Sequence, residues 1–317
     1  MPTSIETPDV SIVIPMLNEA ESIAELSGQI IDVFQKLEKS FEIIFIDDGS
    51  TDASAPTARG LHEQDPRIKL IEFRKNYGKA AALAAGFKMA GGDVVITMDA
   101  DLQDDPGEIS NLLKKIDDGY DLVSGWKKVR HDPFLKRQTS KIYNYFTSLF
   151  SGIRLHDFNC GLKAYRAEVV KTMNVYGELH RYLPVIAHRN GYMVTEIPVK
   201  HHPRRFGTSK YGVARFTRGA FDLMTITFLT RYKKRPLHLF GSWGMLSTFG
   251  GFIILLYLAL QKILFDAHLS NRPLLFLGLL MVIIGVQFFS IGLLGEMITE
   301  ARAESDNYII KSQTGWD

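Results

Sequence analysis

The sequence predicts an α/β protein with a doubly wound, mostly parallel sheet, followed by interfacial helices and a two-helix transmembrane hairpin. Up to about residue 210, short β-rich runs alternate with helical patterns, and this alternation indicates a mostly parallel sheet. From Phe240 onward, the composition changes to two long stretches without charged residues, which is typical of membrane spans.

Six runs are expected to form strands, because each is rich in apolar and β-branched residues. They are Val10–Pro15, Phe41–Asp48, Arg67–Phe73, Asp93–Asp101, Asp121–Trp126 and Met193–His201. Between the first two, apolar residues recur at helical spacing from Ile23 to Leu37, and the Ala-rich stretch Tyr77–Ala90 suits close packing on a sheet. Such sheets bind ligands beyond the carboxyl ends of their strands.

Composition and charge limit the classes of protein. The 317 residues carry a net charge of +2 and are 46% hydrophobic, enough for one good-sized domain with extra elements. Cys160 is the single cysteine, which excludes an internal disulfide and a four-cysteine metal site within one chain. Residues 1–9 are polar and predict no signal peptide. Basic residues cluster at 127–137, 201–210 and 231–235, which indicates local anion or membrane-surface sites and no nucleic-acid partner.

The C-terminal third predicts a membrane hairpin, with a pair of buried core helices as the alternative. The basic residues at 231–235 precede the first uncharged stretch, so the positive-inside rule places that end in the cytosol. The expected boundaries are a soluble domain at 1–210, an amphipathic juxtamembrane helix at 211–235, a membrane region at 236–298 with spans at about 240–263 and 273–295, and a cytosolic tail at 299–317. Residues 211–235 combine an apolar face with basic residues. This amphipathic pattern suits a helix in the headgroup region or one packed on the domain's own core.

The stretch VVITMDADLQDD, residues 94–105, is the strongest chemical signal in the sequence. Asp99 and Asp101 stand at alternate positions where an apolar strand ends, so their carboxylates point to one side and can share a divalent cation. Mg²⁺ or Mn²⁺ held by one or two carboxylates usually completes its shell with substrate phosphates. The pattern therefore predicts a nucleotide diphosphate ligand, the alternative being acidic residues that only solubilise a strand end.

A second acidic pair, Asp47 and Asp48, ends the predicted strand at 41–48. These carboxylates can accept hydrogen bonds from a base N–H group or a ribose hydroxyl. Ser50 and Asp52 follow at positions suited to capping the next helix. We therefore expect ligand contact from Asp47 or Asp48.

Five segments, in this order and spacing, resemble the inverting family-two nucleotide-sugar glycosyltransferases of GT-A fold. They are SIVIPMLNE, IDDGSTD, MDADLQDDP, DFNCGLKAYR and RRFGTSKYG. Within that family the chain is most similar to polyprenyl-phosphate hexosyltransferases, which include dolichol-phosphate mannose synthases and bacterial undecaprenyl-phosphate glucosyltransferases. The resemblance covers about residues 8–235, and the trailing hairpin matches the bacterial two-span architecture.

The resemblance implies a set of residues that bind the donor, the metal ion and the acceptor. Those expected to bind the nucleotide sugar are Pro15, Glu19, Asp47, Asp48, Asp99, Arg204 and Lys210. Those expected to hold the Mg²⁺ or Mn²⁺ ion are Asp99, Asp101 and Gln103. Those expected to bind the lipid phosphate are Lys127, Arg137 and Ser140. A cation and basic side chains would stabilise the charge that develops on the leaving diphosphate, although a headgroup-binding basic strip is the alternative for 204–210.

Asp157 stands where the family has an acidic active-site residue, and together with Asp101 it is the predicted catalytic residue. It would be the general base for a hydroxyl acceptor. A phosphate monoester is already largely dianionic at pH 7, because its second pKa is about 6. We therefore expect Asp157 to orient the acceptor or the sugar.

The predicted protein is an inverting, metal-dependent hexosyltransferase of the inner (plasma) membrane, with its catalytic domain and both termini in the cytosol. The first choice of reaction is transfer of glucose from UDP-glucose to undecaprenyl phosphate, and the main alternative is a GDP-mannose-dependent transferase. A processive polysaccharide synthase is disfavoured because no QxxRW segment occurs. A catalytically inactive membrane scaffold would lack acidic site residues that are present here. The resemblance also allows a homo-oligomer.

Overall fold

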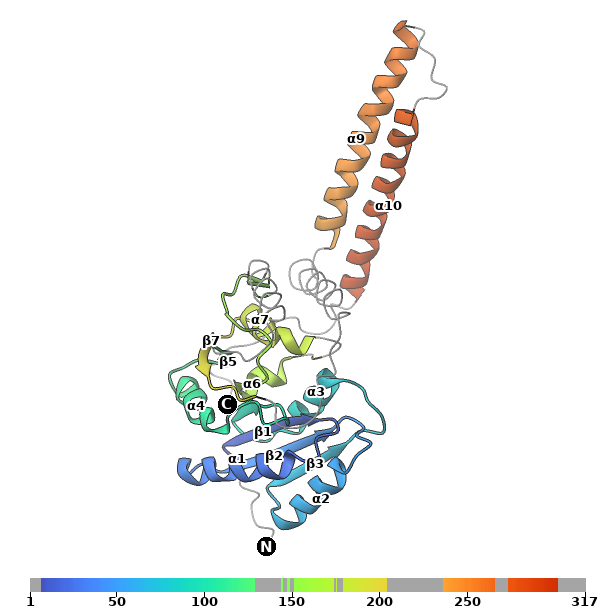
Figure 1. Ribbon diagram of the computed structural model, residues 1–317. Coiled ribbons are helices and arrows are strands. Elements are labelled where there is room, and N and C mark those ends of the chain that lie inside the picture. Colours follow the sequence, from blue (N-terminus) through green and yellow to red (C-terminus); the bar gives the residue numbers. More distant parts are fainter. Residues whose placement is uncertain are drawn as a thin grey trace. The chain divides into compact units, whose positions relative to one another are not determined.

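The computed structural model describes residues 7–128, 144, 147–148, 151–173, 175, 179–203, 236–265 and 273–301. The chain divides into two compact units, Met1–Ile226 and Thr227–Asp317, and each is considered by itself (Figure 1). Several predictions lie outside the described residues: those for Arg137, Ser140, Arg204 and Lys210, for the juxtamembrane helix at 211–235, and for the end of the C-terminal tail, 302–317.

One seven-stranded sheet with strand order β3-β2-β1-β4-β6-β5-β7 forms the first unit. The strands are β1 (Val10–Met16), β2 (Phe41–Asp47), β3 (Ile68–Glu72), β4 (Val94–Thr97), β5 (Leu122–Lys127), β6 (Lys163–Arg166) and β7 (Val194–Val199). Every pairing is parallel except the two made by β6, which runs antiparallel to β4 and to β5. The predicted α/β class and all six predicted strands are confirmed, whereas β6 is an addition.

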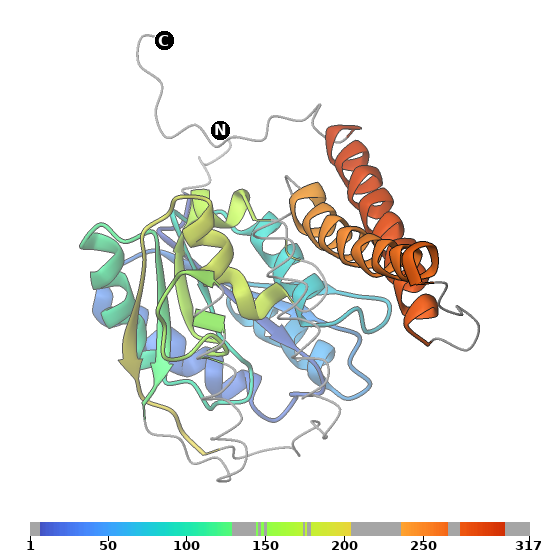
Figure 2. The ribbon, with the colours of Figure 1, turned by 90° about the horizontal axis from the view of Figure 1, so that it is seen from above.

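Helices cover both faces of this sheet (Figure 2). They are α1 (Ile23–Leu37), α2 (Ser54–Gln64), α3 (Lys79–Met89), α4 (Ile109–Asp117), α6 (Ala167–Lys171) and α7 (Leu183–Arg189), with 3₁₀ turns η1 (Pro106–Glu108) and η2 (Leu179–Tyr182). Alternation along β1 feeds two cores, because successive side chains of a strand point to opposite faces. Ile12 and Ile14 join the core under α1 and α4, while Val13 joins the core under α3, α6 and α7.

Small residues let α3 lie close to the sheet, as the Ala-rich sequence predicts. Ala80 and Ala82 are buried, and a Cβ atom at Gly86 would overlap Cγ1 of Val13. The N-terminus of α3 is thereby held next to the carboxyl end of the sheet, where its first residue, Lys79, reaches the acidic segment after β4.

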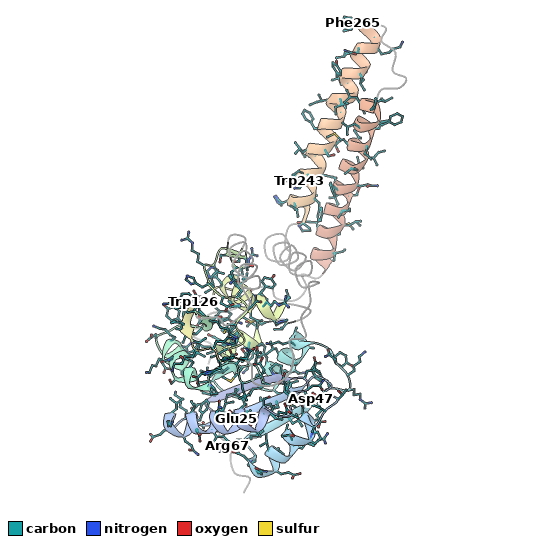
Figure 3. The ribbon with its side chains drawn as sticks, viewed as in Figure 1. Glu25, Asp47, Arg67, Trp126, Trp243 and Phe265 are labelled. Atoms are coloured by element: carbon teal, nitrogen blue, oxygen red, sulfur yellow. The ribbon has the colours of Figure 1, made fainter. Side chains whose placement is uncertain are left out.

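Two long helices, α9 (Pro236–Phe265) and α10 (Pro273–Ala301), make up the described part of the second unit. By length and composition, both helices can cross a membrane. Large apolar side chains such as Trp243 and Phe265 lie on the outside of the pair (Figure 3). The helices expected at about 240–263 and 273–295 lie within α9 and α10, which extend a few residues further.

Glycines allow α9 and α10 to touch through their backbones. A Cβ atom at Gly244 would lie 2.7 Å from the carbonyl oxygen of Gly285, and one at Gly251 would lie 2.6 Å from that of Gly278. Close backbone approach at small residues is a common way for apolar helices to associate. In addition, the backbone N–H of Leu237 donates a 3.3 Å hydrogen bond to Glu296 Oε2, which ties the start of α9 to the end of α10.

Candidate active site

The loops that follow β1 and β2 interlock at the carboxyl edge of the sheet, where Met16 pairs with Asp47. The backbone N–H of Asn18 donates to Ser50 Oγ (2.9 Å), and the N–H of Thr51 donates to Asn18 Oδ1 (2.8 Å). Ser50 Oγ in turn donates to the buried carboxylate of Asp47. Pro15 and Glu19, the other two predicted nucleotide-pocket residues here, lie at the end of β1 and in the loop after it.

Asp48 has a structural task in this region. Its carboxylate accepts hydrogen bonds from the backbone N–H groups of Tyr77 (2.7 Å) and Gly78 (2.9 Å), and its side chain is buried. It therefore holds the loop between β3 and α3 against the end of β2. Direct contact of Asp48 with a nucleotide stays a prediction, and Asp47 is the neighbour that faces the β1 loop.

Asp99 follows β4 and meets two groups that the sequence analysis did not single out. Its carboxylate forms an ion pair with the ammonium of Lys79 and lies against the Cα of Gly161, where a Cβ would stand 2.5 Å from Oδ2. Burial by itself raises the pKa of the Asp99 carboxyl. The positive charges of Lys79 and Lys127, together with the hydrogen bond from Lys79, outweigh burial, so the pKa is held below its usual value.

Asp101 and Gln103 lie in a tight turn beyond Asp99. Asp101 is buried, and its Oδ1 accepts a 3.2 Å hydrogen bond from the backbone N–H of Gln103. The intervening Leu102 has a φ of 58°, a conformation that is uncommon for a non-glycine residue and often marks a functional turn. The carbonyl of Gln103 accepts a 2.8 Å hydrogen bond from the N–H of His202, just after β7. This hydrogen bond ties the turn after β4 to the segment after β7.

The loop before β6 brings Asp157 to the same edge. Because β6 is antiparallel, its first residue, Lys163, pairs with Thr97 at the carboxyl end of β4, and Thr97 Oγ1 donates a 2.8 Å hydrogen bond to the carbonyl of Gly161. Asp157 is buried, and its Oδ1 accepts a 3.0 Å hydrogen bond from the N–H of Asn159. Burial lowers the pKa of the Lys163 amine, whose nearby charges include Asp157 and Asp99.

Lys127, predicted to bind the lipid phosphate, has an internal partner. Its Nζ lies 3.0 Å from Oδ1 of Asp104, whose side chain is fully buried. His201 Nδ1 lies 3.7 Å from the same oxygen. Burial alone would lower the pKa of Lys127, yet the charge and hydrogen bond of Asp104, together with other nearby groups such as Asp99, raise it above its usual value. The ammonium of Lys127 therefore neutralises Asp104 in this structure, and phosphate binding by Lys127 stays a prediction.

The acidic turn can support a metal ion whose remaining ligands come from the substrate. Within the described part of the chain, no group of three or more His, Cys, Asp or Glu side chains forms a ready metal site. Asp99 and Asp101 supply two carboxylates, and Gly161 packs against the carboxylate of Asp99, where a larger side chain would displace it. Mg²⁺ is commonly bound by one or two carboxylates plus substrate phosphates. The residues therefore fit a cation that arrives with a diphosphate.

Comparison with known proteins identifies a matching family and relatives of known activity. Residues 11–173 match the family described as Glycosyl transferase family 2. A dodecaprenyl-phosphate galacturonate synthase from Rhizobium johnstonii is 35% identical over 97% of this chain and 93% of its own. An undecaprenyl-phosphate 4-deoxy-4-formamido-L-arabinose transferase from Salmonella choleraesuis is 38% identical over 91% of this chain and 88% of its own.

Solved structures share the fold of the first unit. The glucosyl-3-phosphoglycerate synthase of Mycobacterium tuberculosis, in a complex with Mn²⁺, UDP-glucose and phosphoglyceric acid, has a TM-score of 0.52 at 17% identity. The match covers 71% of this chain and 79% of that one. At this identity the likeness shows the fold alone, a GT-A arrangement of sheet and helices.

Proposed function

Because the chain belongs to glycosyl transferase family 2, we propose that it transfers a sugar from a nucleoside diphosphate to a polyprenyl phosphate. The observation that carries the proposal is the meeting of two acidic segments. The turn after β4 supplies Asp99 and Asp101, and the loop before β6 supplies Asp157 and packs Gly161 against Asp99. A donor diphosphate on the first segment would have its sugar beside the second.

In the proposed reaction, an oxygen of the lipid phosphate attacks the anomeric carbon of the sugar. The bond from that carbon to the donor diphosphate breaks, and the nucleoside diphosphate leaves with the bonding electrons, so the anomeric configuration inverts. A divalent cation bound at Asp99, Asp101 and Gln103 would supply charge stabilisation for the leaving diphosphate. Lys79, already beside Asp99, adds a second positive charge at that position.

Asp157 is proposed to orient the reactants. A lipid phosphate is largely dianionic at pH 7 and needs no general base. A buried carboxylate next to the attacking dianion would repel it, so the proposed partner of Asp157 is a hydroxyl group of the sugar. Asp101 is proposed as the other catalytic residue, because it shares the diphosphate site with Asp99.

The sugar is proposed to resemble those handled by the two relatives. The sequence predicted glucose from UDP-glucose, but the names of the relatives give galacturonate and 4-deoxy-4-formamido-L-arabinose. The first donors to try are therefore the UDP derivatives of these two sugars, with UDP-glucose and GDP-mannose beside them. The acceptor, a polyprenyl phosphate, is common to both names.

The protein is proposed to work at the cytosolic face of the inner membrane. Helices α9 and α10 would span the bilayer as a hairpin, and the basic residues at 231–235 would keep the first unit and both termini in the cytosol. This placement brings a water-soluble donor and a lipid acceptor to the same enzyme. A homo-oligomer stays a prediction from the resemblance.

The test is a transfer assay with the purified full-length chain, undecaprenyl phosphate, Mg²⁺ or Mn²⁺, and each labelled donor in turn. Label that enters the lipid fraction from one donor, and that is lost in Asp101→Ala, supports the proposal and names the sugar. Absence of label with every donor, together with unchanged melting temperature on adding UDP and Mn²⁺, would favour an inactive membrane scaffold.

A further inference from the structure

A carboxylate-bound imidazole stands at the rim of the site, beside Asp157. The side chain of His156 is 65% exposed, and its Nδ1 contacts Oε1 of Glu196, a residue of β7. The backbone N–H of His156 also donates a 2.8 Å hydrogen bond to Glu196 Oε2. Both oxygens of one carboxylate are thus used to fix one residue, by its ring and by its backbone.

An aromatic contact fixes the plane of the same ring. The imidazole of His156 stacks on the indole of Trp126, with 4.1 Å between ring centroids and 18° between planes. Trp126 belongs to β5, which pairs with β7 in the sheet, so Trp126 and Glu196 reach His156 from neighbouring strands. Trp126 and Asp47 lie in separate parts of the first unit (Figure 3). Their strands, β5 and β2, are separated by three other strands in the sheet.

The segment around His156 is held on its other side as well. The carbonyl of His156 accepts a 2.6 Å hydrogen bond from Nδ2 of Asn144, and the carbonyl of Leu155 accepts one of 3.4 Å from Ser148 Oγ. Asn144 and Ser148 therefore anchor the backbone of this segment, while Glu196 and Trp126 contact the ring itself.

Hydrogen-bond chemistry sets what the ring can offer. A carboxylate oxygen only accepts, so Nδ1 of His156 carries the proton that Glu196 binds. The other ring nitrogen, Nε2, lies on the far side of the ring from Glu196. When the ring is protonated, Nε2 becomes a donor, and a negatively charged oxygen is the partner that forms the strongest hydrogen bond with it.

An exposed cation lies next to the stacked rings of His156 and Trp126. Lys128, next to Trp126, is exposed and has its Nζ 5.8 Å from the indole ring. Lys127 is the nearer cation to the acidic turn, but it lies against the fully buried Asp104. Within the described chain, the exposed groups close to Asp157 in sequence or next to Trp126 that can present positive charge include His156, Arg154 and Lys128.

We propose that His156 binds the phosphate of the polyprenyl acceptor through Nε2, with Glu196 and Trp126 as positioning residues. The inference rests on the proposed function, because it takes the acceptor to be a lipid phosphate. It adds a contact residue to that site. Glu196 contacts Nδ1 and orients the ring, and Trp126 holds the ring plane, so Nε2 of the protonated ring would meet the phosphate in a fixed orientation.

The test measures lipid binding and transfer separately, with full-length protein in nanodiscs. Undecaprenyl phosphate and undecaprenol serve as paired probes, since they differ only in the phosphate. His156→Ala should lose at least about tenfold in affinity for undecaprenyl phosphate, the usual scale for a hydrogen bond to a charged group, and should leave undecaprenol binding unchanged. Where a donor has been found, the KM for the acceptor should rise by the same factor while the KM for the donor stays constant.

Three variants separate contact from fold. His188→Ala removes an exposed histidine of α7 that is remote in sequence from the site, and should behave as wild type. His156→Arg keeps a donor and a charge, and should recover part of the phosphate preference. Glu196→Gln keeps an acceptor for the N–H groups of His156 but removes the charge, and should weaken phosphate binding by a smaller factor than His156→Ala.

The outcomes distinguish the two proposals. Wild-type protein that shows no preference for undecaprenyl phosphate over undecaprenol would overturn the proposed function itself. Wild-type preference that survives in a folded His156→Ala protein would overturn only the role of His156. A rise in the donor KM, with lipid binding unchanged, would also overturn it and would assign His156 to the donor sugar instead.

Discussion

Gly161→Ala is the sharpest test of the way the two acidic segments meet. A Cβ atom at residue 161 would lie 2.5 Å from Oδ2, 2.6 Å from Cγ and 2.8 Å from Oδ1 of Asp99. Ordinary van der Waals contact begins at 3.4 Å, so the carboxylate or the loop must move by about 0.9 Å, the difference between 3.4 and 2.5 Å. The carboxylate is also held by Lys79, which limits how freely it can turn away.

The expected cost falls on both catalysis and folding. A misplacement of about 1 Å at a reacting site can lower the rate about 100-fold, which corresponds to about 2.7 kcal/mol of transition-state stabilisation. Overpacking of this size typically destabilises a protein by about 1–3 kcal/mol. We therefore expect kcat/KM to fall about 100-fold in a chain that still folds.

The assay is steady-state transfer to undecaprenyl phosphate, with thermal unfolding of the same samples as the check on folding. Gly28→Ala is the matched control, because residue 28 is exposed within α1 and a Cβ atom added there would have no heavy atom within 4 Å. That substitution should leave kcat/KM unchanged and stabilise the helix by about 0.5–1 kcal/mol. A Gly161→Ala enzyme with kcat/KM within about twofold of wild type would refute the idea that Asp99 must stay in contact with this loop.

Three further substitutions test contacts inside the first unit. Lys127→Met leaves the carboxylate of Asp104 buried without its cation, so the free energy of unfolding should fall by about 3–5 kcal/mol; a denaturant titration that gives the wild-type midpoint would contradict the ion pair. Asp48→Ala removes the acceptor for the N–H groups at 77–78. The free energy of unfolding should fall by about 1–3 kcal/mol, and tryptic cleavage in that loop should become faster. Wild-type cleavage rates would contradict the structural role of Asp48. Burial and nearby cations lower the pKa of His180 to about 3. In the unfolded chain, the His180 imidazole takes up a proton near pH 6.5, whereas the folded chain keeps it neutral down to about pH 3. The free energy of unfolding should therefore decline by up to about 1.4 kcal/mol per pH unit from 6.5 toward 3. His180→Gln should flatten that part of the stability–pH curve, and an unchanged slope would contradict the burial argument.

The sequence predicted the sheet well because most of its strands carry the signal of burial on both faces. Strands β1, β2 and β4 are rich in apolar residues and almost wholly buried, and α1 shows a clear helical period. Strand β6 was missed for physical reasons. It has only four residues, KAYR, two of them charged, and its strand conformation comes from pairing with β4 and β5 on either side.

Individual roles at the site were harder to predict than its location. The motifs predicted Asp99 and Asp101 at the carboxyl edge of the sheet, and the resemblance predicted Asp157 as an active-site residue. A carboxylate or an ammonium looks the same in sequence whether it faces a ligand or a protein partner. Asp104, the ion-pair partner of Lys127, lies 23 positions earlier in the chain. The glycine at 161 likewise carries no sign in the sequence that a carboxylate lies against it.

Because β6 runs antiparallel to β5, the segment that joins these two strands starts and ends at the same edge of the sheet. Strand β5 ends at the carboxyl edge of the sheet and β6 begins there, with the N–H of Gly125 bonded to the carbonyl of Leu162 at 2.9 Å. Everything between those two anchor points leaves from and returns to one place, so its length and content can change without altering the order of the strands. The entropic cost of lengthening such a loop grows only with the logarithm of its length. Under the proposed function, changes in the part of this segment that precedes Asp157 could therefore alter the acceptor while the order of the strands stays as it is.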